Sequence, residues 1–443
     1  MSLSYAARLT QNVDYGECGL PEVEDTNRVK SRELAKLVRL LERPSHLVVH
    51  TGAGVSTSCG IRDFRGPRGV WTREKAGLGL ALLPGDVPFA EASPSLTHMA
   101  ILGLVRAGRC SFVVSQNVDG LHLRSGLAPE KLAELHGNIF QERCADCGKE
   151  FFRNFDVGGC GFKRTPRQCG ECGGDLFDMV LDWEDQLPER HFSLARRHSL
   201  LADVSLALGT SMRVHPAATI PLLTADKTQR KHANLSGVER VEEDFGEIVD
   251  PATCKKLLSK NGVFAIINLQ PTPHDQEAAV RVHGRCDRVM MEVMRRLRIP
   301  IPDFVRMETV YLRQSSDRRL LVSTDVFVGN LLFARAVSVA LPDGAVLRLT
   351  DECQRFEFDC SAVPVGSQVS VHVVLNGNAT LSELRMQHTM SEGESVTQQE
   401  FEMVRKTFPF DENEDAWLEK DDPPSAAVVD NEPQNKRIKE ESK

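Results

Sequence analysis

Four uninterrupted apolar runs recur along residues 31–303. They read HLVVH at 46–50, SFVVS at 111–115, VSLALG at 204–209 and VFAIINL at 263–269. None of them alternates apolar with polar residues, which is typical of strands that are covered on both faces. These runs therefore predict the strands of a buried sheet.

Helical periodicity lies between and around these runs. Apolar residues fall on one stripe within 31–43, and further helices are predicted at 95–108 and 285–298. Strands that alternate with helices are typical of α/β proteins. The pattern therefore predicts fold class α/β, with a doubly wound, parallel, Rossmann-like sheet.

Beyond residue 303 the chain changes to short β-rich segments. Strands are predicted at 309–313, 320–328, 345–349 and 369–375, with turns at 342–344 and 376–378. From residue 391 the chain is acidic and contains prolines, which predicts a disordered tail.

These changes of pattern predict a domain organisation. It comprises an N-terminal arm (1–30), an α/β domain (31–303) with a cysteine-rich module at 140–178 and an exposed insertion at 225–262, a β-rich accessory domain (304–390) and an acidic disordered tail (391–443).

The charge balance argues against a dedicated nucleic-acid binder. Lys and Arg total 54 and Asp and Glu total 62, so the net charge is −8. The tail from residue 391 has 15 acidic and 7 basic residues and so accounts for the whole excess. No apolar run approaches the roughly 20 residues that span a bilayer, and no signal-peptide pattern opens the chain. We therefore expect an intracellular protein with reduced thiols and no membrane contact.

Four of the 12 cysteines form two tight pairs. Cys144 and Cys147 are followed after 21 residues by Cys169 and Cys172, and glycines adjoin both pairs. Two such turns bring four thiolates around one Zn²⁺ at about 2.3 Å, in an inserted zinc-ribbon small domain. Four thiolates leave no position for an activated water, so we expect one structural Zn²⁺. The alternative is four unrelated thiols, and Cys160 lies between the pairs without a close partner.

The turn TGAGVS at 51–56 follows the first predicted strand. Its glycines allow the backbone to approach a phosphate closely. Thr57 stands where the third glycine of the ordinary dinucleotide fingerprint would be. A dinucleotide site and a tight structural turn therefore both remain open.

Charged and aromatic residues follow at 60–71, in a segment too rich in glycine for a helix. Arg65 is suited to a pyrophosphate, and Phe64 or Trp71 to the wall of a ring-binding pocket. The alternative is a solvated loop that two aromatic residues hold in place.

Polar residues also follow the later strands, at 115–120, 209–211 and 268–270. Ligands bind at the carboxyl ends of strands in open α/β sheets, although strand capping is the alternative. His136, in the segment ELHGN at 134–138, is a candidate general base because the pKa of histidine lies near neutrality. A structural histidine is the alternative there.

Together these motifs resemble the sirtuin family. The matching segments, in order, are GAGVS (52–56), DFRG (63–66), QNVDG (116–120), LHGN (135–138), the two cysteine pairs, GTS (209–211) and NLQ (268–270). They cover about residues 1–303. Within the family, GPRGVWT at 66–72 and LDWEDQLP at 181–188 are similar to class IV, and to its nuclear sirtuin-six type.

The resemblance implies an NAD⁺-dependent protein-lysine deacylase. In this family the acyl oxygen attacks the ribose carbon that bears nicotinamide, nicotinamide leaves, and the products are lysine and O-acyl-ADP-ribose. The matched His136 acts as the base, and the matched Asn117 and Asp119 serve the nicotinamide end. Trp183 and Glu184 match positions near the acyl-lysine peptide.

The resemblance also implies a larger set of cofactor-binding residues. These are Gly52, Ala53, Gly54, Ser56, Thr57, Asp63, Phe64, Arg65, Trp71, Gln116, His136, Gly209, Thr210, Ser211, Asn268, Leu269, Gln270 and Cys286, of which the last seven match the adenosine side.

Class IV sirtuins are associated with a nuclear location, with histone tails and nucleosomes, and with removal of acetyl and long fatty acyl groups. Mono-ADP-ribosyl transfer is a second activity of the class. A basic cluster at 436–439 is either a nuclear import signal or a solvated run of charges.

The chain departs from the family pattern in several places. Arg62 replaces the proline that usually precedes D-F-R, and the second cysteine pair is more closely spaced than in the sirtuin-six type. The resemblance explains neither 225–262 nor the segment beyond 303.

Two other functions remain as alternatives. One is a chromatin- or ADP-ribose-binding protein with weak catalysis. The other is an ordinary Rossmann oxidoreductase, against which the missing third glycine and the zinc ribbon argue.

Overall fold

The protein is described by a computed structural model. It describes residues 5–10, 15–79, 81, 83–153, 155–233, 251–324, 334–350, 356–375, 383–405, 410–411 and 416–417. Residues 1–407 form one compact unit and residues 408–443 another. In the second unit, β19 (Phe410–Asp411) pairs with β20 (Ala416–Trp417).

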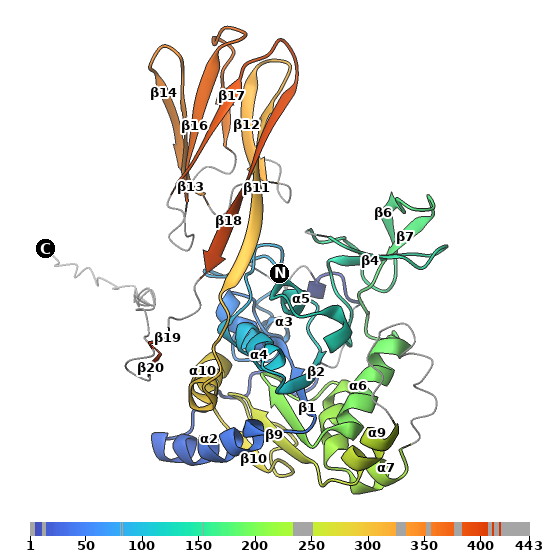
Figure 1. The fold of residues 1–443 in the computed structure, drawn as a ribbon. Helices are drawn as coiled ribbons and strands as arrows, with labels where there is room; N and C mark the ends of the chain where they lie inside the picture. Colours follow the sequence, from blue (N-terminus) through green and yellow to red (C-terminus); the bar gives the residue numbers. More distant parts are fainter. Residues whose placement is uncertain are drawn as a thin grey trace, which may run out of the picture. The chain divides into compact units, whose positions relative to one another are not determined.

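Six parallel strands form the central sheet, in the order β10-β9-β8-β1-β2-β3 (Figure 1). They are β1 Leu47–Thr51, β2 Cys110–Ser115, β3 Leu132–Glu134, β8 Val204–Leu208, β9 Val263–Ile267 and β10 Val280–Val282. Every residue of β1 and β8 is buried, which confirms the prediction from the uninterrupted apolar runs. The three-residue strands β3 and β10 have no predicted counterpart, because they are too short to give a pattern. The order of strands reverses between β1 and β8.

Two groups of helices cover this sheet (Figure 1). The first group is α2 (Asn27–Glu42), α4 (Leu96–Arg106) and α10 (Cys286–Leu297), and α10 packs on both of the others. The second group is α6 (Glu189–Leu201), η4 (Ala217–Thr224), α7 (Lys227–Lys231) and α9 (Pro251–Leu258). The three helices predicted from periodicity are confirmed, and α2 begins four residues earlier than predicted.

Helices α7 and α9 fall within the predicted exposed insertion at 225–262. Arg230 is 3% exposed, and its guanidinium donates to the carbonyl oxygens of Leu200 at 2.6 Å and Leu257 at 2.9 Å. Most of the described residues of this segment are exposed, as predicted, but the segment is helical and buried Arg230 ties it to the α/β domain. Residues 234–250 lie outside the described residues.

The cysteine-rich module is a four-stranded antiparallel sheet in the order β5-β4-β7-β6. Its strands are β4 Gln141–Cys144, β5 Glu150–Phe152, β6 Arg164–Gln168 and β7 Asp175–Asp178. The fully buried carboxylate of Glu142 accepts hydrogen bonds from Arg153 at 2.7 Å, Thr165 at 2.8 Å and Arg167 at 2.9 Å. Two cations and a hydroxyl thus compensate the burial of one charge.

Residues beyond 303 form two four-stranded antiparallel sheets with a shared core, here called the β-sandwich. The sheets have the orders β15-β12-β11-β18 and β14-β13-β16-β17. The strands are β11 Phe304–Gln314, β12 Arg319–Thr324, β13 Ala334–Ala340, β14 Val346–Thr350, β15 Glu357–Asp359, β16 Gln368–Leu375, β17 Glu383–Thr389 and β18 Ser395–Arg405. Their inward residues pack in one apolar cluster, which includes Val310, Val337, Phe356 and Val371.

The β-sandwich corrects one predicted boundary. β18 pairs with β11 along eleven residues, so a disordered tail from residue 391 is wrong at its start. Residues 391–405 alternate polar with apolar positions weakly, and only pairing with β11 organises them. The predicted turn at 376–378 and the last four residues of the predicted strand 320–328 lie outside the described residues, as does the basic cluster at 436–439.

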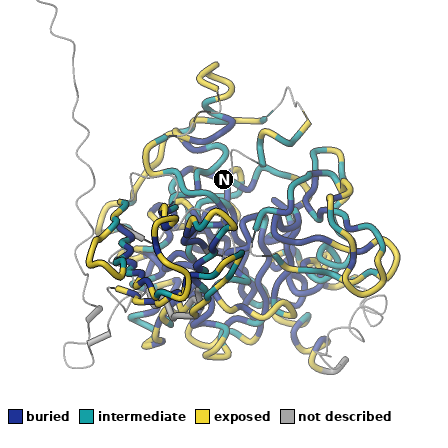
Figure 2. The backbone as a smooth tube through the Cα atoms, turned by 90° about the horizontal axis from the view of Figure 1, so that it is seen from above, coloured by how far each residue is buried: buried dark blue, intermediate teal, exposed yellow. Residues whose placement is uncertain are grey.

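Buried stretches gather in the interior, and exposed residues lie along peripheral turns (Figure 2). Among the described residues, none of the helices has both the length and the apolarity to cross a lipid bilayer.

Candidate functional site

The turns that follow β1, β2 and β8 touch one another at the carboxyl edge of the parallel sheet. The Gly54 N–H donates to the Gly209 carbonyl oxygen at 2.8 Å, and Gln116 Nε2 donates to Thr210 Oγ1 at 3.2 Å. Since β1 and β8 flank the reversal of strand order, these turns surround the position at which open α/β sheets bind ligands. We call this region the sheet-edge site.

Close backbone contact accounts for three glycines of these turns. A Cβ at Gly54 would lie 2.8 Å from the Gly209 Cα, and a Cβ at Gly209 would lie 2.6 Å from the Gly54 carbonyl carbon. A Cβ at Gly52 would lie 2.7 Å from the Thr210 Cβ. No side chain fits at such distances. Packing alone therefore requires these glycines, whatever ligand the turn binds.

Asn117 and Asp119 are buried and bonded to the turn after β1. Asn117 Nδ2 donates to the Gly52 carbonyl oxygen at 3.1 Å and to Ser56 Oγ at 3.3 Å. The Ser56 hydroxyl in turn donates to Asp119 Oδ2 at 2.7 Å, and the Leu121 N–H donates to Asp119 Oδ1 at 3.0 Å. These bonds hold the two predicted catalytic side chains in one orientation.

His136 lies beside the turn after β2. Its Nδ1 is 2.8 Å from the Gln116 carbonyl oxygen, which can only accept a hydrogen bond. The neutral ring is therefore protonated at Nδ1, and Nε2 carries the lone pair. Burial by the surrounding protein lowers the pKa of His136 to about 4, although part of its surface stays exposed. The imidazole is consequently neutral at physiological pH, as a general base must be.

A glycine next to His136 admits the chain that follows the cysteine module. Gly137 has φ +81°, and a Cβ there would lie 1.7 Å from the Met179 carbonyl oxygen. The Leu181 N–H donates to the His136 carbonyl oxygen at 3.2 Å. The module thus contacts the backbone of the candidate base directly.

Two arginines supply positive charge at the sheet-edge site. Burial lowers the pKa of Arg65 to about 10, and the charge of Arg213 acts in the same direction. The charge of Arg65 also contributes to the lowered pKa of His136, so both groups lie within electrostatic reach of each other. Arg213 is already paired with Glu17 at 2.8 Å, so Arg65 is the charge at this position that the diphosphate of a dinucleotide can use.

Aromatic rings form a wall next to Arg65. The Trp71 ring centroid lies 4.4 Å from the Arg65 Cζ, 4.6 Å from the Phe64 ring and 4.9 Å from the Trp183 ring. Tyr15 of the N-terminal arm stacks on Trp71 at 5.4 Å, with 11° between the planes. Trp183 Nε1 is buried and has no hydrogen-bond partner among the described residues. The wall therefore holds one donor that a ligand oxygen can use, while neighbouring Glu184 is exposed.

Accessibility separates the predicted cofactor residues into two groups. Those that keep exposed surface are Ala53, Gly54, Thr57, Asp63, Phe64, Arg65, Gln116, His136, Ser211, Asn268 and Leu269. Those that are buried are Gly52, Ser56, Trp71, Gly209, Thr210, Gln270 and Cys286. A ligand in the site can contact the first group directly, whereas most of the second group supports it.

Three of the predicted cofactor residues are bonded mainly to the protein itself. The Asp63 carboxylate accepts the Gly66 N–H at 3.2 Å, and burial raises its pKa to about 6. Gln270 Nε2 donates to the Leu20 carbonyl oxygen at 2.5 Å, and the Cys286 thiol lies on the backbone of β9. These groups order the arm, the loop and the sheet around the site.

Sequence reasoning missed several residues of the site. Behind Asn117, Thr51 Oγ1 donates to Ser115 Oγ at 3.0 Å and lies 2.8 Å from His122 Nε2. The usable signal was a hydroxyl residue at the end of three of the four apolar runs, at Thr51, Ser115 and Thr210. Nothing in the local pattern indicates Tyr15 or Arg213, because each reaches the site through tertiary contacts.

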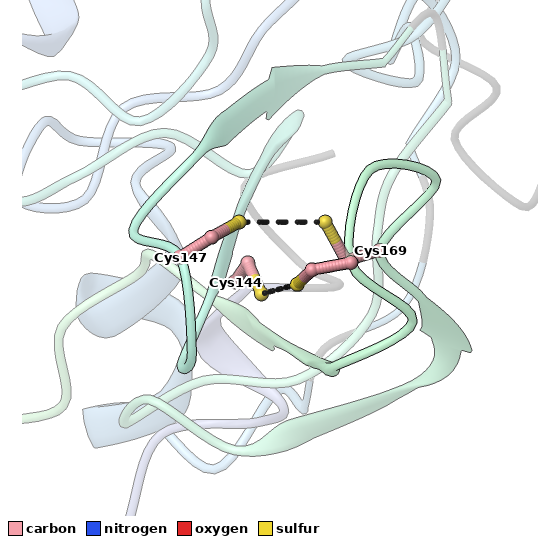
Figure 3. Close-up of side chains that lie close together, drawn as sticks. Cys144, Cys147 and Cys169 are labelled. Atoms are coloured by element: carbon pink, nitrogen blue, oxygen red, sulfur yellow. Dashed lines mark hydrogen bonds between the residues drawn. The ribbon is translucent and has the colours of Figure 1, made fainter.

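The four paired cysteines converge within the module, and Figure 3 labels three of them, Cys144, Cys147 and Cys169. Cys144 Sγ lies 3.4 Å from Cys172 Sγ, Cys147 Sγ lies 3.6 Å from Cys169 Sγ, and all four sulfurs lie within 4.8 Å of one another. A tetrahedron with Zn–S bonds of about 2.3 Å has edges of about 3.8 Å. The four-cysteine cluster therefore fits a structural zinc site. Cys160 is buried elsewhere, with its thiol on the Leu181 carbonyl oxygen.

The chain is similar in sequence to several known proteins. The sequence pattern of the Sir2 family matches residues 83–216. Over 77% of this chain, the sequence is 41% identical to the NAD-dependent protein deacetylase SRT1 of Oryza sativa subsp. indica. It is 40% identical to SRT1 of Arabidopsis thaliana, also over 77% of this chain. These matches span 66% and 68% of the two plant proteins. The chain is also 37% identical to the NAD-dependent protein deacetylase Sirt6 of Drosophila melanogaster, over 69% of this chain and 87% of that protein. The chain therefore belongs to the Sir2 family, the sirtuins.

Proposed function

We propose that this protein is an NAD⁺-dependent protein-lysine deacylase that uses the sheet-edge site. The observation that carries the proposal is the geometry of His136. Its Nδ1 is bonded to a backbone carbonyl oxygen, its Nε2 lone pair is available, and its lowered pKa keeps it neutral. The names of the plant and fly relatives support the same activity.

The residues present suit NAD⁺ in two respects. Arg65 places a positive charge at the sheet-edge site that suits a diphosphate, and the aromatic wall of Phe64 and Trp71 can exclude water from the reacting atoms. When bound, NAD⁺ supplies a ribose carbon with nicotinamide as its leaving group.

The protein's own side chains then have distinct tasks. Asn117 and Asp119, held by Ser56, keep the nicotinamide end of the site in one shape. With the cofactor bound, His136 Nε2 would take up a proton from a ribose hydroxyl, and the Gln116 carbonyl oxygen would stabilise the imidazolium through Nδ1–H. In this proposal the aromatic wall with Trp183 contacts the acyl-lysine side chain, which the ring contact of Trp71 with Trp183 supports.

We further propose that the chain is a class IV sirtuin of the sirtuin-six type, that its substrates are histone tails or other nuclear proteins, and that it acts in the nucleus. The segments at 66–72 and 181–188 and the similarity to Sirt6 support the first point. The basic cluster at 436–439 supports the nuclear location, which imaging of the tagged protein with and without that cluster would test.

One mass-spectrometric assay tests the activity. The protein is incubated with NAD⁺ and acetylated, myristoylated or unmodified histone peptides, and free lysine, O-acyl-ADP-ribose and ADP-ribosyl adducts are measured. His136→Ala should lower turnover by about 10²–10⁴-fold while the protein keeps its fold and zinc. His232→Ala, at an exposed histidine outside the site, is the matched control and should keep full turnover.

Other outcomes would contradict the proposal. Undiminished turnover in the His136 variant removes the proposed mechanism. Formation of reduced NAD would indicate an oxidoreductase, and tight ADP-ribose binding without turnover would indicate a binding protein.

A further inference from the structure

Arg62 and Asp86 form a buried ion pair beside the loop that carries Phe64 and Arg65. Arg62 Nε donates to Asp86 Oδ1 at 3.1 Å, and Arg62 Nη2 donates to Asp86 Oδ2. The two side chains are only 8% and 10% exposed. A two-pronged arginine–carboxylate contact fixes orientation as well as distance.

Backbone groups next to Arg62 and next to Asp86 also take part in this contact. The Val87 N–H donates to the Gly60 carbonyl oxygen at 2.8 Å, and Arg62 Nη2 also donates to the Ala81 carbonyl oxygen at 3.2 Å. Asp86 Oδ2 accepts the Leu83 N–H at 2.8 Å, so the carboxylate is itself held in place. These bonds join residues 60–62 to residues 81–87.

The loop needs such support because of its composition. It contains Gly60, with φ +79°, together with Gly66 and Gly69, and glycine-rich backbone loses much conformational entropy when it is ordered. At its other end, the Asp63 carbonyl oxygen accepts the Val70 N–H, and the Phe64 carbonyl oxygen accepts the Trp71 N–H, both at 2.9 Å. The loop is thus held from two sides.

We propose that the Arg62–Asp86 ion pair is a positioning element that sets the affinity for NAD⁺ by pre-ordering residues 60–66. Neither side chain needs to touch the cofactor. The pair holds the loop in the arrangement in which Arg65 lies over the Trp71 ring and Phe64 joins the aromatic wall. The inference rests on the proposed function, and it assigns a role to the arginine that replaces the usual proline of the family.

Loss of the ion pair should weaken NAD⁺ binding, because fewer molecules would have an ordered loop. If the loop is ordered in only a fraction of molecules, the apparent dissociation constant rises by the inverse of that fraction. Arg62→Ala and Asp86→Asn should each raise the Kd for NAD⁺ and for ADP-ribose roughly tenfold or more. Turnover at saturating NAD⁺ should change far less, because the chemical groups remain. The Arg62→Ala/Asp86→Asn double variant should bind NAD⁺ no more weakly than the weaker-binding single variant, since both substitutions remove the same contact.

The experiment uses the full chain and two readouts. Calorimetric titration gives the Kd values, and hydrogen–deuterium exchange without ligand should show faster exchange in 60–66 and 81–87 in each variant. Arg167→Ala removes an ion pair with buried Glu142 in the cysteine-rich module and controls for a general loss of stability. It should leave exchange in 60–66 and the NAD⁺ affinity unchanged.

Two results would overturn the role of the ion pair. The inference is overturned if a folded Arg62→Ala protein shows wild-type exchange in 60–66 and a Kd for NAD⁺ within about twofold of the wild-type value. Additive effects on the Kd in the double variant would also overturn it. If Arg62→Ala fails to fold, Asp86→Asn and Arg62→Lys answer the same question. If the wild-type protein binds no NAD⁺, the proposed function fails, whereas the exchange data still decide whether the pair orders the loop.

Discussion

The parallel sheet and the β-sandwich bury their strands in different ways. Every residue of β1 and β8 is buried, whereas β17 alternates strictly between exposed and buried residues. Helices cover both faces of the parallel sheet, so its side chains are used for packing and its chemistry lies at the strand ends. Each sheet of the sandwich packs one face on the shared core and turns the other outward.

The polar groups of the two regions differ accordingly. In the β-sandwich, buried His388 contacts Thr397 Oγ1 at 2.9 Å and Gln314 Oε1 at 3.3 Å, so its ring nitrogens have partners within the sandwich. At the sheet-edge site, His136 keeps one nitrogen for a ligand and Trp183 Nε1 has no partner among the described residues. His136 Nε2 is thus open to a ligand, whereas both ring nitrogens of His388 are engaged within the β-sandwich.

Removal of zinc should produce the largest effect, and only in the parallel-sheet region. A structural zinc site contributes about 10 kcal/mol or more to folding, and the module touches His136 and Gly137 through residues 179–181. We expect a chelator to unfold the module and abolish turnover while hydrogen exchange in β16 and β17 stays slow. Metal analysis should find one equivalent of zinc in the active protein. Full turnover in zinc-free protein would contradict this assignment.

Truncation of the sandwich core should give the next largest effect, in the other region. Phe356 is 1% exposed, and Phe356→Ala should destabilise the β-sandwich by about 3–5 kcal/mol. Exchange in β11 and β16 should then accelerate, while the Kd for NAD⁺ and turnover at low temperature should not change. Val365→Ala, at a 47% exposed position, is the control. A parallel loss of turnover in the Phe356 variant would mean that the two regions are coupled.

The smallest effect should be on the pH dependence of folding stability, through Glu134 at the carboxyl end of β3. Glu134 is buried and accepts a hydrogen bond from Asn138 Nδ2 at 2.9 Å, and burial raises its pKa from 4.5 to about 8. The unfolded chain therefore releases this proton at lower pH than the folded chain, and stability falls as the pH rises from about 4.5 to about 8.

Glu134→Gln removes this dependence because the amide stays neutral. Its melting temperature should exceed that of the wild type at about pH 8 and differ less at about pH 5. Glu130→Gln, at an exposed residue nearby, should change neither value. Equal shifts at both pH values would show that proton release by Glu134 is not the cause.

Local patterns were sufficient for the strongly apolar strands of the parallel sheet and for the paired cysteines. The strands β1, β2, β8 and β9 follow from apolar runs, and the cysteine cluster follows from spacing alone. β18 and the helices near Arg230 escaped prediction, since their stability comes from pairing with β11 and from a buried arginine rather than from their own pattern.

The sequence by itself therefore determined the layered α/β core, the zinc ligands and the residue types at the candidate site, because each depends on neighbours along the chain. Only the tertiary structure decided which of these residues keep exposed surface at the sheet-edge site. The contact of His136 with Gln116, the stacking of Tyr15 on Trp71 and the Arg62–Asp86 ion pair each join residues from separate segments. Their distances depend on how the whole sheet, arm and module pack together, which no local pattern encodes.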